Sequence, residues 1–170
     1  MKKWLFTLTL LTFTIAGVQA QRFAYVDTEY ILEKIPEYND AQKKLDGMAI
    51  VWNEEIEAKY NEVKQLYAKY QAEEFLLTDE MKKKRQDEII AKEQVANELQ
   101  KQRFGFEGDL FKKRQELIQP IQEKVYNAIE KIAANLGYDF IFDKAAGGST
   151  LLYTNSKYDL SEQVLKSIQP

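Results

Sequence analysis

Apolar residues recur with a helical period through the middle of the chain. From residue 41 to residue 70 successive apolar positions lie three or four residues apart, which is the spacing of one face of an α-helix. These positions are Ala41, Leu45, Met48, Trp52, Ile56, Tyr60, Val63, Tyr67 and Tyr70. A later series recurs at every seventh residue: Ile90, Asn97, Phe104, Phe111, Ile118, Val125 and Ile132. The two series predict two long helices.

One reversal signal separates these helices, at Leu77-Thr78-Asp79-Glu80. Threonine suits a helix N-cap and acidic residues suit a first turn, so we expect a helical hairpin with its tip near residues 77–80. Two residues that face each other across the hairpin should then have numbers that add to 157, as those of Thr78 and Asp79 do. That pairing sets Trp52 beside Gly105 and Pro36 beside Ile121. Gly105 either makes room for the indole or reflects looseness in a weakly packed helix.

The predicted contact between the two helices is apolar only on the near side of Phe111. Farther out, the second helix carries Glu93, Gln100 and Glu107 at the positions that should complete the seam. Few buried apolar contacts leave a region easy to open. The outer hairpin is therefore predicted to be mobile.

Short segments of strand-like composition flank the hairpin. Residues 22–27 and 138–143 are rich in aromatic and β-branched residues, which favours strands, and residues 151–153 predict a third strand. Residues 145–149 read as a turn, and Asp159-Leu160-Ser161-Glu162 as the start of a last helix. Asp27-Thr28-Glu29 should begin a short helix that ends at Ile35-Pro36, and Gly137 should cap the long second helix.

The predicted fold class is therefore α+β and mostly α. A long antiparallel helical hairpin, a coiled-coil arm of residues 36–136, projects from a small β-rich body of residues 21–35 and 137–170. So small a body rarely buries enough apolar surface to stand alone. We expect it to self-associate into an oligomer. The residues predicted to form that interface are Phe23, Tyr25, Phe140, Ile141 and Phe142.

The first twenty residues have the pattern of a secretory signal peptide. A basic start at Lys2 and Lys3 precedes an uncharged apolar stretch that ends at the small residue Ala20, which predicts export and cleavage after Ala20. An uncleaved membrane anchor is the alternative, although the stretch is short for spanning a bilayer. No cysteine follows, so a lipid-anchored lipoprotein is excluded.

Composition excludes several kinds of chemistry. The chain has no cysteine and no histidine, which removes thiol nucleophiles, imidazole bases, disulfides and most zinc sites. Without Lys2 and Lys3 it carries 22 basic and 27 acidic residues, a net charge of −5, which argues against nucleic acid as a partner. We interpret Asp27, Asp139 and Asp143 as caps and turn residues rather than as a catalytic or metal cluster. No enzymatic activity, metal or cofactor is expected.

Several of these segments resemble a known family. The opening Phe23-Ala24-Tyr25-Val26-Asp27, the long charged hairpin and the C-terminal segment from Gly137 to Ile168 are similar to the Skp/OmpH periplasmic chaperones. The resemblance implies a homotrimer with a central β-barrel and three helical arms around a cavity. It also implies that unfolded outer-membrane β-barrel proteins are held there, without ATP, until insertion. Known members are strongly basic, whereas this chain is acidic.

Aromatic residues of the hairpin are the candidates for binding such clients, because large side chains with polar tips suit loose contacts. The candidates are Trp52, Tyr67, Tyr70, Phe75, Phe104 and Phe106. For Trp52 and Phe104 the spacing favours a seam between the helices instead. Phe75 and Phe106 lie off the seam and are expected on the cavity wall.

A basic run, Lys82-Lys83-Lys84-Arg85, follows the tip. It is either a solvated helix face or a contact for anionic lipid head groups. The alternative to a chaperone is a coiled-coil structural or tethering protein of the cell envelope.

Overall fold

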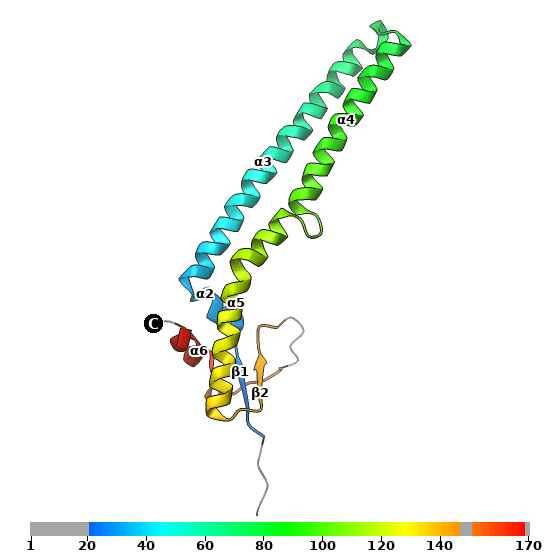
Figure 1. Ribbon diagram of the computed structural model, residues 1–170. Coiled ribbons are helices and arrows are strands. Elements are labelled where there is room, and N and C mark those ends of the chain that lie inside the picture. The colour runs from blue at the N-terminus through cyan, green and yellow to red at the C-terminus, as the bar shows by residue number, and fades with distance from the viewer. Residues whose placement is uncertain (1–20, 147–150, 169–170) are drawn as a thin grey trace, which may run out of the picture. The chain divides into compact units, whose positions relative to one another are not determined.

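The computed structural model describes residues 21–146 and 151–168 (Figure 1). In chain order the elements are β1 (Phe23–Val26), α2 (Thr28–Glu33), α3 (Pro36–Glu73), the 3₁₀ turn η1 (Glu74–Leu76), α4 (Asp79–Phe104), α5 (Asp109–Leu136), β2 (Phe140–Asp143), η2 (Ser156–Tyr158) and α6 (Ser161–Ile168). The fold is α+β and mostly helical, as predicted. The predicted signal peptide with its cleavage after Ala20, and residues 147–149 of the predicted turn, lie outside the described residues.

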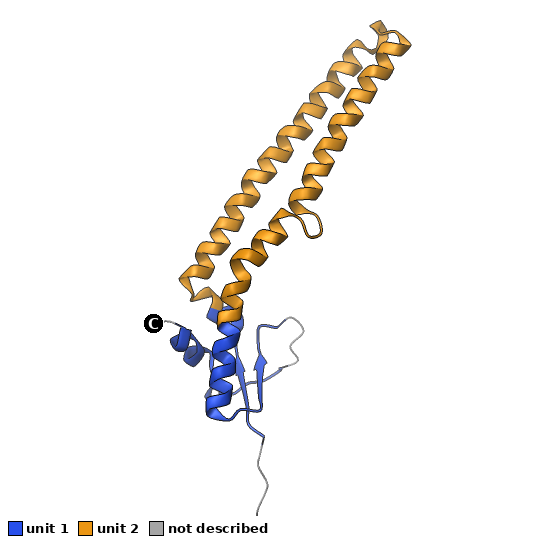
Figure 2. Cartoon of the chain, in the orientation of Figure 1, with its two compact units in different colours: residues 1–31, 125–170 blue, residues 32–124 orange. Residues whose placement is uncertain are grey.

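The chain divides into two compact units, one of residues 1–31 and 125–170 and one of residues 32–124 (Figure 2). The division runs through α5, whereas the sequence places the end of the hairpin at residue 136. Among the described residues no helix is both long enough and apolar enough to cross a membrane.

The ends of α3 and the start of α4 follow local signals. Ile35 has extended backbone angles, with φ −90° and ψ 116°, and Pro36 opens α3. A proline fits there because the first turn of a helix has no use for its missing N–H. At the other end η1 tightens the chain, and the Thr78 hydroxyl accepts a hydrogen bond from the Met81 amide at 3.3 Å. The tip predicted at residues 77–80 is confirmed.

The second helix of the hairpin is not continuous, contrary to the prediction. It stops at Phe104 and restarts at Asp109, and the four residues between, Gly105 to Gly108, form a turn that we call the 105–108 loop (Figure 1). The Gly108 amide donates to the Gly105 carbonyl at 2.9 Å. Glu107 has a φ of 55°, in the left-handed region. α5 runs through Pro120 without ending there.

This loop changes the pairing of the two sides of the hairpin. Tyr60 contacts Asn97 in the outer part, so the facing numbers add to 157 as predicted. On the other side of the loop Lys124 lies 3.9 Å from Glu37, and the sum becomes 161. The shift of four equals the length of the loop. The prediction that Pro36 lies level with Ile121 is wrong for this reason.

The loop also moves the seam of the second helix by one residue. In α4 the buried position is Ala96 rather than Asn97, and Ile90 is exposed. Beyond the loop the predicted positions Ile118, Val125 and Ile132 are buried, although Phe111 is exposed. Ile118 forms a cluster with Ala41 and Leu45. The predicted seven-residue series assumes an unbroken helix. It therefore identifies buried positions in α5 but not in α4.

In the other unit β1 and β2 form a parallel two-stranded sheet, with Phe23 opposite Phe140 and Tyr25 opposite Phe142. β2 begins at Phe140, two residues later than predicted, because Gly137 with φ 67° and the Tyr138 amide, which donates to the Ala133 carbonyl at 3.0 Å, still belong to the cap of α5. Residues 151–153 are not a strand. The sheet instead gains an isolated parallel bridge between Tyr25 and Asp159.

Alternation along β1 divides its side chains between two faces of the sheet. Ala24 and Val26 point to one face and are buried, as are Leu160, Val164 and Leu165 of the last helix region. Val164 and Leu165 therefore belong to the buried face of α6, and Leu160 is buried just before it.

Candidate functional site

The opposite face of the sheet carries a group of exposed phenylalanines. Phe23 stacks on Phe140 with ring centroids 5.5 Å apart and on Phe142 at 6.2 Å. All three rings are about half exposed. Tyr25 shares this face by alternation but is buried within the single chain, and Ile141, the fifth residue predicted for the oligomer interface, is half-buried on the other face.

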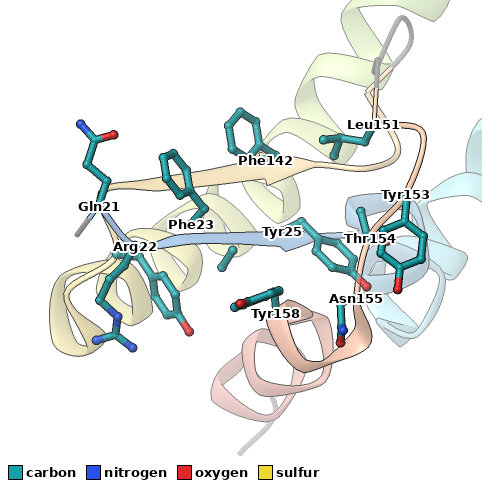
Figure 3. Close-up of a pocket in the computed structure, with 12 residues that line it drawn as sticks. Gln21, Arg22, Phe23, Tyr25, Phe142, Leu151, Tyr153, Thr154, Asn155 and Tyr158 are labelled. Carbon is teal, nitrogen blue, oxygen red and sulfur yellow. The ribbon is translucent and has the colours of Figure 1, made fainter.

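Beside these rings lies a pocket of about 590 Å³ (Figure 3). Half of the residues that line it are aromatic: Phe23, Tyr25, Tyr138, Phe142, Tyr153 and Tyr158. Arg22 sits at its edge, with its guanidinium 4.8 Å from the centre of the Tyr138 ring. The phenylalanine face and this pocket adjoin each other, since Phe23 and Phe142 belong to both.

Asp27 acts as a cap and Asp143 as a turn residue that accepts from the Ala145 amide at 3.0 Å, as the sequence suggested, whereas Asp139 bonds to a distant residue. Asp27 accepts from the Tyr30 amide at 3.0 Å at the start of α2, and Asp139 accepts from the Arg22 amide at 2.8 Å. Asp143 accepts from the Thr28 hydroxyl at 2.7 Å. Within residues 21–146 and 151–168, no three acidic side chains gather into a metal-binding group.

A groove of about 590 Å³ runs between α3 and α4 in the outer hairpin. Its apolar walls are Val63, Tyr67, Ile89 and Ile90, and tyrosines mark it at both ends. Tyr67 is 53% exposed and is accessible to a ligand, whereas Tyr70 is only 8% exposed. The candidate Tyr70 is thus mainly part of the hairpin's own packing.

Hydrogen bonds of side chains hold the helices together along this groove. The Tyr60 hydroxyl lies 2.7 Å from Asn97 Oδ1 and 2.8 Å from Gln100 Oε1. Gln86 Nε2 donates to the Tyr70 hydroxyl at 2.8 Å. Burial, together with Glu74, raises the pKa of Tyr70.

An ion pair crosses the same region. Lys92 Nζ lies 2.7 Å from Glu62 Oε1. This hydrogen bond lowers the pKa of Glu62 and raises that of Lys92. Both side chains are more than 40% exposed, and pairs of that kind contribute little to stability. The mobility predicted for the outer hairpin stays a prediction.

Trp52 and Phe104 contact each other across the hairpin. Their rings meet edge to face with centroids 6.3 Å apart, a favourable arrangement for aromatic pairs. The interpretation of these two residues as seam residues is supported by this contact. Trp52 was predicted beside Gly105, and instead it meets the residue before it because α4 ends there.

Arg103 lies before the 105–108 loop and contacts residues beyond it and on α3. Its Nη1 lies 2.6 Å from Asp109 Oδ2 and its Nη2 lies 3.2 Å from Glu55 Oε2, while the guanidinium sits 5.0 Å from the centre of the Trp52 ring. We call these three contacts the Arg103 clasp. Sequence reasoning missed it, since Arg103 lies one position off the assumed seam. Two glycines enclosing Phe106 and Glu107 were the available signal for the break.

Phe106 and Phe75 are the most exposed of the candidate client-binding residues. Phe106 is 96% exposed on the loop, and Phe75 is 80% exposed in η1 at the tip. Leu76 and Met81 are also exposed beside Phe75, a group the sequence analysis did not single out. Of the basic run, Lys83 and Lys84 are exposed and Lys82 is half-buried, while Arg85 pairs with Glu88 at 3.2 Å. Exposed apolar groups thus occur at the tip, in the groove and on the loop.

A long hairpin with exposed apolar groups and a small sheet with an aromatic face define a class of binding proteins. Residues 22–168 match the family described as outer membrane protein (OmpH-like), and the chain belongs to that family. It is 27% identical to the chaperone protein Skp of Yersinia enterocolitica over 99% of this chain and 100% of that protein. It is 25% identical to the chaperone protein Skp of Pectobacterium atrosepticum, with the same coverage.

A solved structure shares the fold. A putative outer membrane chaperone (OmpH-like) from Caulobacter crescentus superposes with a TM-score of 0.67 at 10% identity, over 89% of this chain and 86% of that chain. The predicted family is confirmed by the match over residues 22–168.

Proposed function

We propose that this protein is an ATP-independent holdase of the periplasm that binds unfolded outer-membrane proteins and prevents their aggregation before insertion. The observation that carries the proposal is the spread of exposed apolar side chains over the hairpin, at Phe75, Tyr67 and Phe106, in a chain of this family. Many separate apolar contacts suit a client with no fixed shape. The relatives are named chaperones, which supports the same activity here.

The working form of the protein in this proposal is a homotrimer. Phe23, Phe140 and Phe142 expose stacked rings on a sheet that has two strands in the described part of the chain. A two-stranded sheet is marginal alone and gains most from further packing. Joining three copies through this face buries those rings and leaves the hairpins available for the client.

A contact with anionic lipid surfaces is a second part of the proposal. Lys82, Lys83 and Lys84 follow the exposed apolar tip at Phe75 and Leu76. Basic side chains next to exposed apolar ones favour the interface of an anionic bilayer.

The test is the aggregation of an unfolded client. A small outer-membrane β-barrel protein is diluted from urea into buffer with and without the mature protein, and light scattering is followed. A holdase keeps scattering low for several unrelated β-barrel clients without ATP. Unsuppressed scattering, together with tight binding to one folded envelope protein, would instead support the tethering alternative.

A further inference from the structure

The 105–108 loop is a costly way to connect α4 and α5. Glu107 adopts a left-handed conformation, which residues other than glycine rarely adopt. A Cβ on Gly105 would lie 2.3 Å from the Lys101 carbonyl oxygen, and one on Gly108 would lie 2.8 Å from that of Gln102. The residue that this backbone places outward is Phe106, which is 96% exposed. A connection that served only to join two helices would have no need of an exposed phenylalanine.

The Arg103 clasp fixes this loop to the rest of the hairpin. Asp109 is the first residue after the loop, so the bond from Arg103 to Asp109 joins the loop's two ends. The contacts to Glu55 and Trp52 tie the same guanidinium to α3. Within the described residues Arg103 Nε is buried and has no hydrogen-bond partner. The two terminal nitrogens therefore make all of its polar contacts, which only a forked side chain can do.

The area that Phe106 offers suggests what it binds. A phenylalanine buries at most about 250 Å², far less than the roughly 1,200 Å² or more of a stable interface between folded proteins. A single projecting ring suits a weak contact with apolar side chains of an unfolded chain, repeated at other points of the hairpin.

The geometry points to Arg103 as a positioning residue that holds Phe106 outward for apolar side chains of the unfolded client. The inference rests on the proposed function and names one of its contact points. Loss of the clasp frees the loop ends, so Phe106 loses its fixed direction while its ring remains present.

The experiment measures the affinity of the full mature protein for a fluorescently labelled outer-membrane β-barrel protein diluted from urea. Phe106→Ala and Arg103→Met should each weaken binding about fivefold, as expected for loss of one aromatic contact. The double variant should be no weaker than either one, because both changes remove the same contact. Arg103→Lys should recover part of the affinity. Trp52, the only tryptophan after residue 20, should change its emission in Arg103→Met and not in Phe106→Ala.

Arg114→Met is the matched control, since Arg114 is exposed on α5, and it should not change affinity. The inference is overturned if Arg103→Met shifts Trp52 emission or thermal stability with affinity unchanged, or if the two losses multiply in the double variant. Circular dichroism checks that each variant is folded, and Arg103→Lys carries the test if Arg103→Met is not. A wild-type protein that binds no client overturns the proposed function itself, which is a different result.

Discussion

Glycine residues in the hairpin occupy two different environments. Gly105 ends α4, and its missing Cβ leaves room for the Lys101 carbonyl oxygen. Gly47 lies inside α3, and a Cβ there would meet nothing within 4 Å. The same substitution should therefore have opposite effects at the two positions.

Gly105→Ala should lower the free energy of unfolding by about 1–3 kcal/mol, because backbone atoms must move to admit the methyl group. Gly47→Ala should raise it by about 1 kcal/mol, because alanine is the better helix former. Urea unfolding followed by circular dichroism measures both. Equal effects of the two substitutions would contradict the loop geometry.

Charge is another property decided at single residues. The folded-state pKa of Glu62 is lowered by its hydrogen bond from Lys92. A carboxylate with a lowered pKa contributes stability above its unfolded value, near 4.5, and loses that contribution as the pH falls through the folded value. Lys92, with a raised pKa, loses its contribution only at strongly alkaline pH.

Glu62→Gln should therefore reduce stability slightly at pH 7 and remove part of the stability loss that the wild type shows below about pH 4.5. Thermal unfolding at several pH values measures this. Glu57→Gln, an exposed carboxylate on the same helix, is the control. An identical acid dependence in wild type and Glu62→Gln would show that the pair contributes nothing.

Among the elements, those with local signals could be predicted from the sequence. Pro36, Thr78 and Gly137 each fix a helix end through the conformation of one or two residues, and all three ends occur where predicted. The break at residues 105–108 could not be found from periodicity. Phe104 and Phe111 are seven residues apart, so the series looks unbroken across the loop.

Features that depend on distant partners were also out of reach. Residues 151–153 have strand-like composition, but a strand needs a neighbour, and the bridge to β1 forms at Asp159 instead. The Arg103 clasp joins α3, α4 and α5, and nothing near Arg103 in the sequence indicates Glu55 as its partner. The candidate client-binding residues could be chosen by residue type. Their exposure could not be predicted, because it depends on which residues of the two sides of the hairpin face each other.

For the whole molecule, the phenylalanine face of the sheet leads to a test of assembly. Phe140→Asp places a charge where stacked rings would be buried between copies, and burial of an unpaired charge is strongly unfavourable. Native mass spectrometry should give three times the monomer mass for the wild type and monomer for this variant. Tyr126→Asp, at an exposed position of α5, should leave the trimer intact. A trimeric Phe140→Asp protein would place the interface elsewhere.

Net charge gives the second test at this scale. Residues 37–136 hold 17 basic and 20 acidic side chains, a net charge of −3 and hence −9 for three copies. Long-range attraction of an acidic client is then absent, and at physiological ionic strength charges are screened beyond about 8 Å.

Client affinity should therefore stay level or rise modestly from low to moderate salt. Titrations of a labelled unfolded outer-membrane protein across a salt series measure it. Binding to anionic vesicles through Lys82, Lys83 and Lys84 should weaken with salt instead. A steep salt-dependent loss of client affinity would mean that electrostatic attraction dominates capture.

The length of the 105–108 loop determines how the two sides of the hairpin would pair without it. Four residues are close to the 3.6 residues of one helical turn, so deleting the loop and joining the helices would rotate the flanking faces by only roughly 40°. The contacts from Tyr60 to Asn97 and from Glu37 to Lys124 already lie on the two sides of this insertion. A variant without these four residues should therefore keep most of its packing against α3.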